Sequence, residues 1–215
     1  MRTIALLSRK GGAGKTTLAL HLAVIAQQAG RRVVLVDCDP QRSAADWWRA
    51  READDPAMVE TDAGQLPAVI EAARADGVGL VVVDTRPSVE ADAVAVARAA
   101  DLVLIPTRPA ILDLRAIGGT VDVVRAVGAR AAVVLNGCPP GQGFGPPAVV
   151  REARRGLAGY GLPVAPVAVT LRAAMAHALI GGAAVTEYEP AGKAASEMRK
   201  LWAWIEGQLW ASARH

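Results

Sequence analysis

The segment that most constrains this chain of 215 residues is a glycine-rich loop, SRKGGAGKTT, at residues 8–17. It follows the short apolar run of residues 4–7, as a loop between a strand and a helix would. Its glycines let the backbone turn so that N–H groups point inward, and a helix that begins near Thr16 directs its positive end at the same space. The loop therefore predicts a cradle for the phosphate groups of a nucleotide.

One substitution separates this loop from the usual phosphate-binding pattern, G-x-x-x-x-G-K-[ST]. The first glycine of that pattern falls at position 9, where this chain has Arg9, followed by a second lysine, Lys10. We expect Lys15 to neutralise charge on the β- and γ-phosphates, and the Thr16 hydroxyl to ligate Mg²⁺. The expected nucleotide contacts in the loop are Lys10, Gly11, Gly12, Ala13, Gly14, Lys15, Thr16 and Thr17.

The run KGGAGKTT resembles the deviant Walker A box of the ParA/MinD family of ATPases. The resemblance implies ATP as the nucleotide and a homodimer that sandwiches it, with Lys10 reaching the partner's phosphates. Lys10 and Lys15 are then both catalytic residues. A generic phosphate-loop NTPase with an incidental lysine is the alternative. Within the family, the chain is most similar to the small ParF-like proteins that partition plasmids or position cargo.

A second motif, DCDPQ at residues 37–41, resembles the Walker A′ segment of the same family. We expect Asp39 to orient the water that attacks ATP, and Asp37 to support Mg²⁺ or the phosphate loop. Phosphoryl transfer needs positioning and charge neutralisation more than a strong base, so a well-placed carboxylate suffices. The alternative is a simple turn with a helix-capping aspartate.

A third acidic position, Asp84, closes the apolar run of residues 80–83 in the manner of a Walker B strand, and we expect it to contact Mg²⁺ through water. Arg86, two residues later, could meet phosphate, the partner subunit or solvent. Asn136 is expected to hydrogen-bond the adenine edge and Pro166 to cover its face. A strand-terminal Asn is as often a turn former, so that alternative stays open.

Short apolar runs alternate with longer amphipathic segments, which is typical of an α/β protein with a mostly parallel, twisted sheet and helices on both faces. Strands are expected at residues 3–7, 33–37, 80–84, 102–106, 131–136 and 164–169, and helices at 16–28, 44–51, 66–75, 89–99, 117–127, 148–158, 173–180 and 191–210. The phosphate loop, Asp37, Asp84 and Asn136 then lie at the strand ends where ligands bind in such sheets. We therefore expect a single P-loop NTPase domain over residues 1–215.

Composition narrows the class and the location of the protein. The chain is 52% hydrophobic, but no apolar run approaches the roughly 20 residues that a membrane span requires. The two cysteines, Cys38 and Cys138, suit a reducing compartment, and the N-terminus does not read as a secretory signal. Together with the family resemblance, these features predict a cytoplasmic, nucleoid-associated protein.

The net charge is only +3, but basic residues gather in the last third of the chain. With the resemblance, this predicts that the ATP dimer binds DNA without sequence preference and releases it after hydrolysis. A ParB/ParG-like or cargo-adaptor partner would stimulate that hydrolysis. The candidate DNA contacts are Arg172, Arg151, Arg154, Arg155, Lys193, Arg199 and Lys200.

The C-terminal segment at residues 198–210 leaves two interpretations open. One helical face carries Met198, Leu201, Trp202, Ile205 and Leu209. Such a face suits docking against the sheet, which is our expectation. A terminal amphipathic helix with tryptophans would also suit a membrane-cycling ATPase of the MinD type. A metabolic P-loop ligase is a third alternative.

Overall fold

The computed structural model describes residues 1–87, 90–141 and 145–210. One sheet contains strands in the order β3-β2-β4-β1-β5-β6, and every neighbouring pair is parallel. The strands are β1 (Arg2–Leu6), β2 (Val33–Cys38), β3 (Ala57–Glu60), β4 (Leu80–Thr85), β5 (Leu102–Thr107) and β6 (Ala131–Leu135). The helices are α1 (Lys15–Gln28), α2 (Ser43–Arg49), α3 (Leu66–Ala75), α4 (Glu90–Ala99), α5 (Ile111–Ala116), α6 (Gly118–Ala126), α7 (Ala148–Ala158), α8 (Ala173–Ile180), α9 (Val185–Tyr188) and α10 (Lys193–Trp210).

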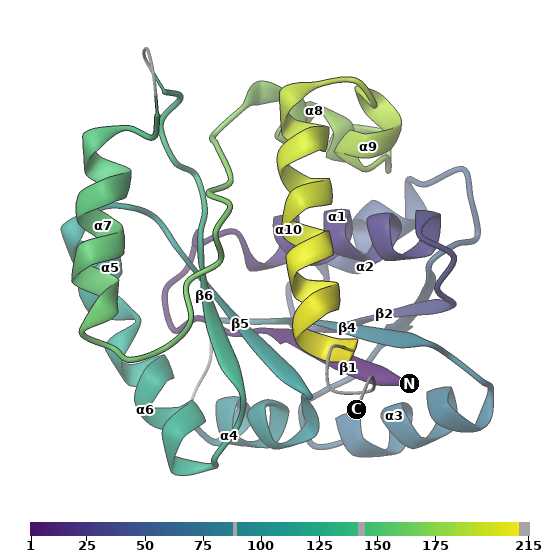
Figure 1. Ribbon diagram of the computed structural model, residues 1–215. Coiled ribbons are helices and arrows are strands. Elements are labelled where there is room, and N and C mark those ends of the chain that lie inside the picture. Colours follow the sequence, from purple (N-terminus) through teal and green to yellow (C-terminus); the bar gives the residue numbers. More distant parts are fainter. Residues whose placement is uncertain (88–89, 142–144, 211–215) are drawn as a thin grey trace.

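Helices cover both faces of the sheet (Figure 1), which confirms the expected fold class. Along β1, Ile4 and Leu6 belong to one apolar core and Ala5 to the other, as the two-residue period of a strand requires. The first core lies under α1, α2, α8, α9 and α10, and the second under α3 to α7. Burial on both faces explains why the strands are near-continuous apolar runs.

The prediction of a strand at residues 164–169 was wrong. Within the segment only Val164 makes an isolated bridge, to Val133 of β6, and a second bridge joins Thr170 to Cys138 just beyond it. Its backbone approaches β6, since Ala165 N–H donates to the Val133 carbonyl at 2.9 Å. However, Pro163 and Pro166 have no N–H with which to continue a ladder, so the pairing stays local.

Other differences concern short elements with weak patterns. The edge strand β3 has only four residues, each exposed or half-buried, so it lacks an apolar signal. The helices α5 and α9 were also not expected, and the helix expected at 117–127 is observed as α6, directly after α5. The helix expected at 89–99 is observed as α4, and residue 89 lies outside the described residues.

The C-terminal helix α10 packs onto α1 and the sheet, which confirms the docking interpretation. Its apolar face, from Met198 to Leu209, is buried in the first core. Near its end, Arg31 pairs with Glu206 at 2.7 Å and stacks over the Trp210 ring at 4.1 Å. The surface that a membrane-binding helix would need is therefore already covered. Among the described helices, none is both long enough and apolar enough to cross a bilayer.

His21 of α1 is a fully buried titratable group that ties this helix to the segment around α8 and α9. Its Nδ1 accepts a hydrogen bond from the Val185 N–H at 3.1 Å, and its Nε2 donates to the Met175 carbonyl at 3.3 Å. Only the neutral ring, protonated at Nε2, can do both. Burial lowers the pKa of His21 to about 4, against smaller opposing effects of the Met175 carbonyl and Glu187.

We predict that His21 alone makes the free energy of unfolding fall by about 2 kcal/mol between pH 7.5 and pH 5. The unfolded chain takes up a proton near the ordinary pKa of 6.5, whereas the folded chain resists protonation until its lowered pKa of about 4. Stability is therefore full above pH 6.5 and is lost as the pH falls. Urea unfolding of the wild type and of His21→Gln at both pH values isolates this contribution, and an unchanged pH dependence in the variant would contradict it.

Candidate functional site

The phosphate loop lies at the carboxyl end of β1, the strand between β4 and β5. Gly14 closes the loop with a φ of +92° and precedes α1 without a side-chain cap, so the first N–H groups of the helix have no side-chain acceptor there. A Cβ on Gly14 would collide with the side-chain nitrogen of Asn136. The position therefore requires glycine both for its backbone angle and for its contact.

Lys15, the lysine of the ordinary pattern, lies in the first turn of α1 and is only 6% exposed. Burial lowers the pKa of Lys15, and the nearby carboxylates of Asp84 and Asp39 oppose that shift. A buried ammonium at the mouth of a helix N-terminus gains from a strong negative charge beside it. Its position thus suits the expected contact with nucleotide phosphate.

Lys10, the second lysine, is held by its own chain. Its ammonium pairs with the Asp113 carboxylate of α5 at 2.7 Å, and the two side chains are 41% and 11% exposed. The preceding residue is also anchored, because the Arg9 N–H donates to Thr120 Oγ1 at 3.3 Å. Lys10 would have to leave Asp113 to reach the phosphates of a second subunit. Sequence reasoning missed this ion pair because it did not expect α5.

Asp84 and Thr16 form the candidate Mg²⁺ position. Asp84 is fully buried, and neither of its carboxylate oxygens has a hydrogen-bond partner among the described residues. Burial raises the pKa of Asp84 to about 7, although the nearby Thr16 hydroxyl and Lys15 ammonium favour its charged form. A bound cation would relieve the cost of this unpartnered carboxylate, so the residues fit Mg²⁺. In the described part of the chain, no three His, Cys, Asp or Glu side chains could hold a metal ion together, so the other ligands would be phosphate and water.

Asp37 organises the loop that carries Asp39. One oxygen of the Asp37 carboxylate accepts the Asp39 N–H at 2.9 Å, and the other accepts the N–H groups of Ala44 and Ala45 at 3.1 Å each. Asp37 thus holds both the Asp39 loop and the first turn of α2, a capping role that the sequence did not predict for it. Burial raises the pKa of Asp37, and these backbone hydrogen bonds oppose that rise. Its contribution to Mg²⁺ binding stays a prediction.

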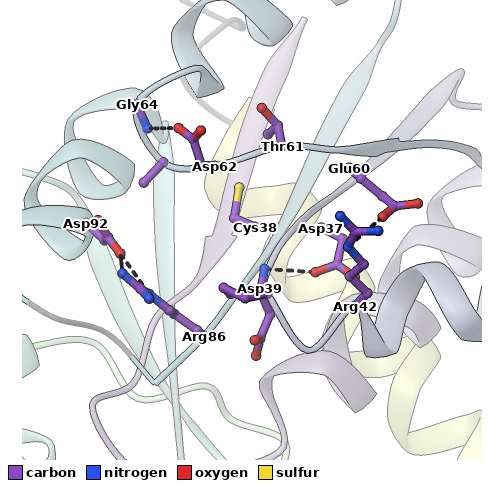
Figure 2. Close-up of a pocket in the computed structure, with 12 residues that line it drawn as sticks. Asp37, Cys38, Asp39, Arg42, Glu60, Thr61, Asp62, Gly64, Arg86 and Asp92 are labelled. Atoms are coloured by element: carbon purple, nitrogen blue, oxygen red, sulfur yellow. Dashed lines mark hydrogen bonds and ion pairs between the residues drawn. The ribbon is translucent and has the colours of Figure 1, made fainter.

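Asp39 borders a cavity of about 530 Å³ (Figure 2). It is half-buried, and its carboxylate accepts the Gln41 N–H at 2.9 Å. Figure 2 shows an ion pair on each side of Asp39, Arg86 with Asp92 and Arg42 with Glu60. Arg86 thus pairs with Asp92 while its side chain stays 39% exposed to solvent, and a contact with phosphate or with the partner subunit stays a prediction.

Asn136 reaches the phosphate loop, whereas Pro166 does not. The Asn136 amide donates to the Ala13 carbonyl at 2.9 Å and lines a cavity of about 470 Å³ beside the loop. Pro166 lines a different cavity, and its carbonyl accepts a hydrogen bond from Arg154 at 2.9 Å. The structure thus separates two residues that we expected on either side of the adenine. The structure supports a role for Asn136 in holding the loop, and it leaves contact between Asn136 and the base untested.

The cavity beside Asn136 contains residues that sequence reasoning missed. Its apolar wall comprises Val169, Leu171, Met175 and Leu179, and Arg108 lies at the phosphate loop. Arg108 follows a strand end, as the other site residues do, but that signal is weak until the neighbouring strands are known.

The seven candidate DNA contacts do not come together on one element. Arg172 precedes α8 and pairs with Glu197 at 2.7 Å. The others belong to α7 or to α10, two helices that lie apart in Figure 1. Three of them bind carbonyls of their own chain: Arg151 that of Pro146, Arg154 that of Pro166 and Arg199 that of Pro190. Arg155, Lys193 and Lys200 are exposed. Their role in DNA binding stays a prediction.

Comparisons with known proteins agree with this geometry. Residues 4–144 match the CobQ/CobB/MinD/ParA nucleotide binding domain. The chain is 38% identical over 201 residues to the maintenance of carboxysome distribution protein A of Gloeobacter kilaueensis, which covers 91% of this chain and 88% of that protein. A protein of the same name from Halothiobacillus neapolitanus is 30% identical over 203 residues, or 91% of each chain. The solved structure of apo McdA from Cyanothece has a TM-score of 0.79 at 17% identity and covers 97% of this chain and 99% of that one.

The fold and the two-lysine loop, with its acidic partners, define a P-loop ATPase of the deviant Walker A type. The chain belongs to the ParA/MinD family of nucleotide-binding proteins. The resemblance stated from the loop and the DCDPQ motif is therefore confirmed, as is its consequence that the protein hydrolyses ATP.

We predict that Asn136→Ala weakens the binding of ATP and of GTP by a similar factor, about fivefold, because the variant loses the hydrogen bond that holds the loop at Ala13. Competition titrations with both nucleotides measure the two affinities. A loss confined to ATP would show instead that Asn136 reads the adenine edge.

Proposed function

We propose that this protein is a ParA-type positioning ATPase that dimerises on ATP, binds DNA without sequence preference and leaves it after hydrolysis. The observation that carries the proposal is the second lysine. Lys10 is partly exposed beside the cradle, and its only ion-pair partner among the described residues is Asp113. A lysine in that place supports a contact between subunits better than a contact within its own cradle, where Lys15 already lies.

The proposed chemistry divides among the residues at the strand ends. Lys15 would neutralise phosphate charge, and the N–H groups of the loop and of α1 would hold the phosphate oxygens. Thr16 and Asp84 would hold Mg²⁺, which when bound would neutralise the β- and γ-phosphates. Asp39 would orient the attacking water, while Asp37 keeps the Asp39 loop in place.

The proposed cargo is a protein assembly positioned over the nucleoid, or alternatively a DNA locus. The support is that both carboxysome distribution relatives align along nearly the whole chain. An adaptor bound to the cargo would stimulate hydrolysis in the dimer. The membrane-cycling alternative loses its main support because the apolar face of α10 is buried.

We predict that Asp39→Ala still binds ATP but hydrolyses it at least about a hundredfold more slowly, so that the dimer persists. Removing the carboxylate abolishes water orientation, whereas the cradle residues are unchanged. Phosphate release with and without the activator measures the rate. Asp46→Ala is a matched control, since Asp46 lies on α2 and its one ion-pair partner within the described part of the chain is Arg49. Wild-type turnover in Asp39→Ala would place the catalytic role elsewhere.

The same variant tests DNA binding. The persistent ATP dimer should bind DNA of unrelated sequences equally, with a log–log salt slope of about −0.9 for each phosphate contacted, and the ADP form should bind weakly. No binding by a dimer that sedimentation shows to be intact would contradict the DNA part of the proposal. Binding of that dimer to anionic vesicles instead would favour the membrane-cycling function.

A further inference from the structure

Arg108 stands immediately after β5, the strand that pairs with β1, and therefore lies beside the phosphate loop. Its side chain passes close to two glycines, Gly12 and Gly137. A Cβ on Gly12 would lie 3.8 Å from Arg108 Nη2, and a Cβ on Gly137 would lie 3.7 Å from Cγ and 3.8 Å from Nε. Both glycines have positive φ, +72° and +61°, so the chain is bare of side chains where the arginine crosses it.

The guanidinium of Arg108 is exposed and has no hydrogen bond or ion pair with any residue that the structure describes. The neighbouring arginines differ in this respect. Arg172, in the wall of the same cavity, is paired with Glu197, and Arg86 is paired with Asp92. Of the two arginines that line this cavity, Arg108 is therefore the one with no partner among the described residues.

The cavity itself favours an anionic ligand with an apolar part. Its volume is about 470 Å³. The charged side chains that line it are Arg108 and Arg172, and no acidic side chain among the described residues lines it. One wall is formed by loop residues Gly12, Gly14 and Thr17, and the opposite wall is apolar, with Val169, Leu171 and Met175. A nucleotide whose phosphates lie in the loop would direct its phosphate chain past Arg108 and its base toward the apolar wall.

We propose that Arg108 binds a phosphate group of the nucleotide from the cavity side of the loop, and so strengthens the binding of ADP and of ATP alike. This rests on the proposed nucleotide site and adds a third cation to Lys10 and Lys15. The guanidinium suits the role because its planar fork can donate two hydrogen bonds to one phosphate, and because no carboxylate among the described residues lines the cavity. The other source of phosphate at this position would be DNA bound by the dimer, and the experiment separates the two.

The test measures the affinities of Arg108→Gln for ADP and ATP with Mg²⁺, by calorimetry, in the absence of DNA. We expect Arg108→Gln to bind each nucleotide about tenfold more weakly than the wild type does. The affinities of Arg108→Lys should lie between those of Arg108→Gln and the wild type, because an ammonium keeps the charge without the fork. Arg115→Gln is the matched control, an exposed arginine of α5 outside the cavity. Thermal unfolding without nucleotide should be unchanged, since Arg108 contributes no internal pair.

Three results would overturn the inference. The first is an affinity of Arg108→Gln for both nucleotides equal to that of the wild type. The second is a loss of affinity for ATP alone, which would place Arg108 at the γ-phosphate or at a second subunit. The third is unchanged nucleotide affinity with weakened DNA binding, which would assign the phosphate to DNA. A different result would contradict the proposed function and leave this inference intact: Arg108→Gln binds ATP and ADP more weakly than the wild type does, but the wild type does not dimerise with ATP.

Discussion

The structure depends on one steric constraint, the close approach of the phosphate loop to the end of β6. Gly14 has a backbone angle that favours glycine and leaves no room for a side chain beside Asn136. Asn136 in turn donates a hydrogen bond to the Ala13 carbonyl, which fixes the loop from the outside. With β1 in the centre of a sheet buried on both faces, the loop is held on a rigid support and its N–H groups can face a phosphate without rearrangement.

Two buried charged side chains, Lys15 and Asp84, lie beside that support, and burial destabilises the charge on each. Burial lowers the pKa of Lys15 and raises that of Asp84 to about 7. Phosphate beside the lysine and a cation beside the carboxylate would offset both penalties together. On the proposed function, the site would therefore bind a metal–nucleotide complex better than either part alone. Asp39 and Lys10 stand around this centre, the first as the proposed water-orienting group and the second as the proposed link between subunits.

The sequence predicted the central strands and the phosphate loop well because their signals are local. Apolar runs such as residues 80–83 and the spacing of glycines and lysines need no tertiary context. The edge elements were harder. β3 is short and half-exposed, and prolines interrupt the segment at 164–169 although it lies along β6. Pro166 of this segment lines a different cavity from Asn136, and its contact with the base stays a prediction.

The roles of Asp113 and Arg108 were beyond sequence reasoning for a different reason. Each depends on which residue from another element faces it: Lys10 for Asp113, and Gly12 and Gly137 for Arg108. The carboxylate of Asp37 likewise accepts hydrogen bonds from three N–H groups, on the Asp39 loop and at the start of α2, and this role was not expected from the sequence. Residue type and spacing thus locate the cradle, whereas pairing partners emerge only from the packing of separate strands and helices.

The central claim, that Lys10 acts between subunits, is tested most directly by sedimentation velocity with a non-hydrolysable ATP analogue and with ADP. The wild type should sediment as a dimer with the analogue and as a monomer with ADP. Lys10→Ala should bind the analogue with an affinity within about threefold of the wild type and remain a monomer, because Lys15 and the loop N–H groups hold the nucleotide in each subunit. A Lys10→Ala protein that dimerises as the wild type does would contradict the account.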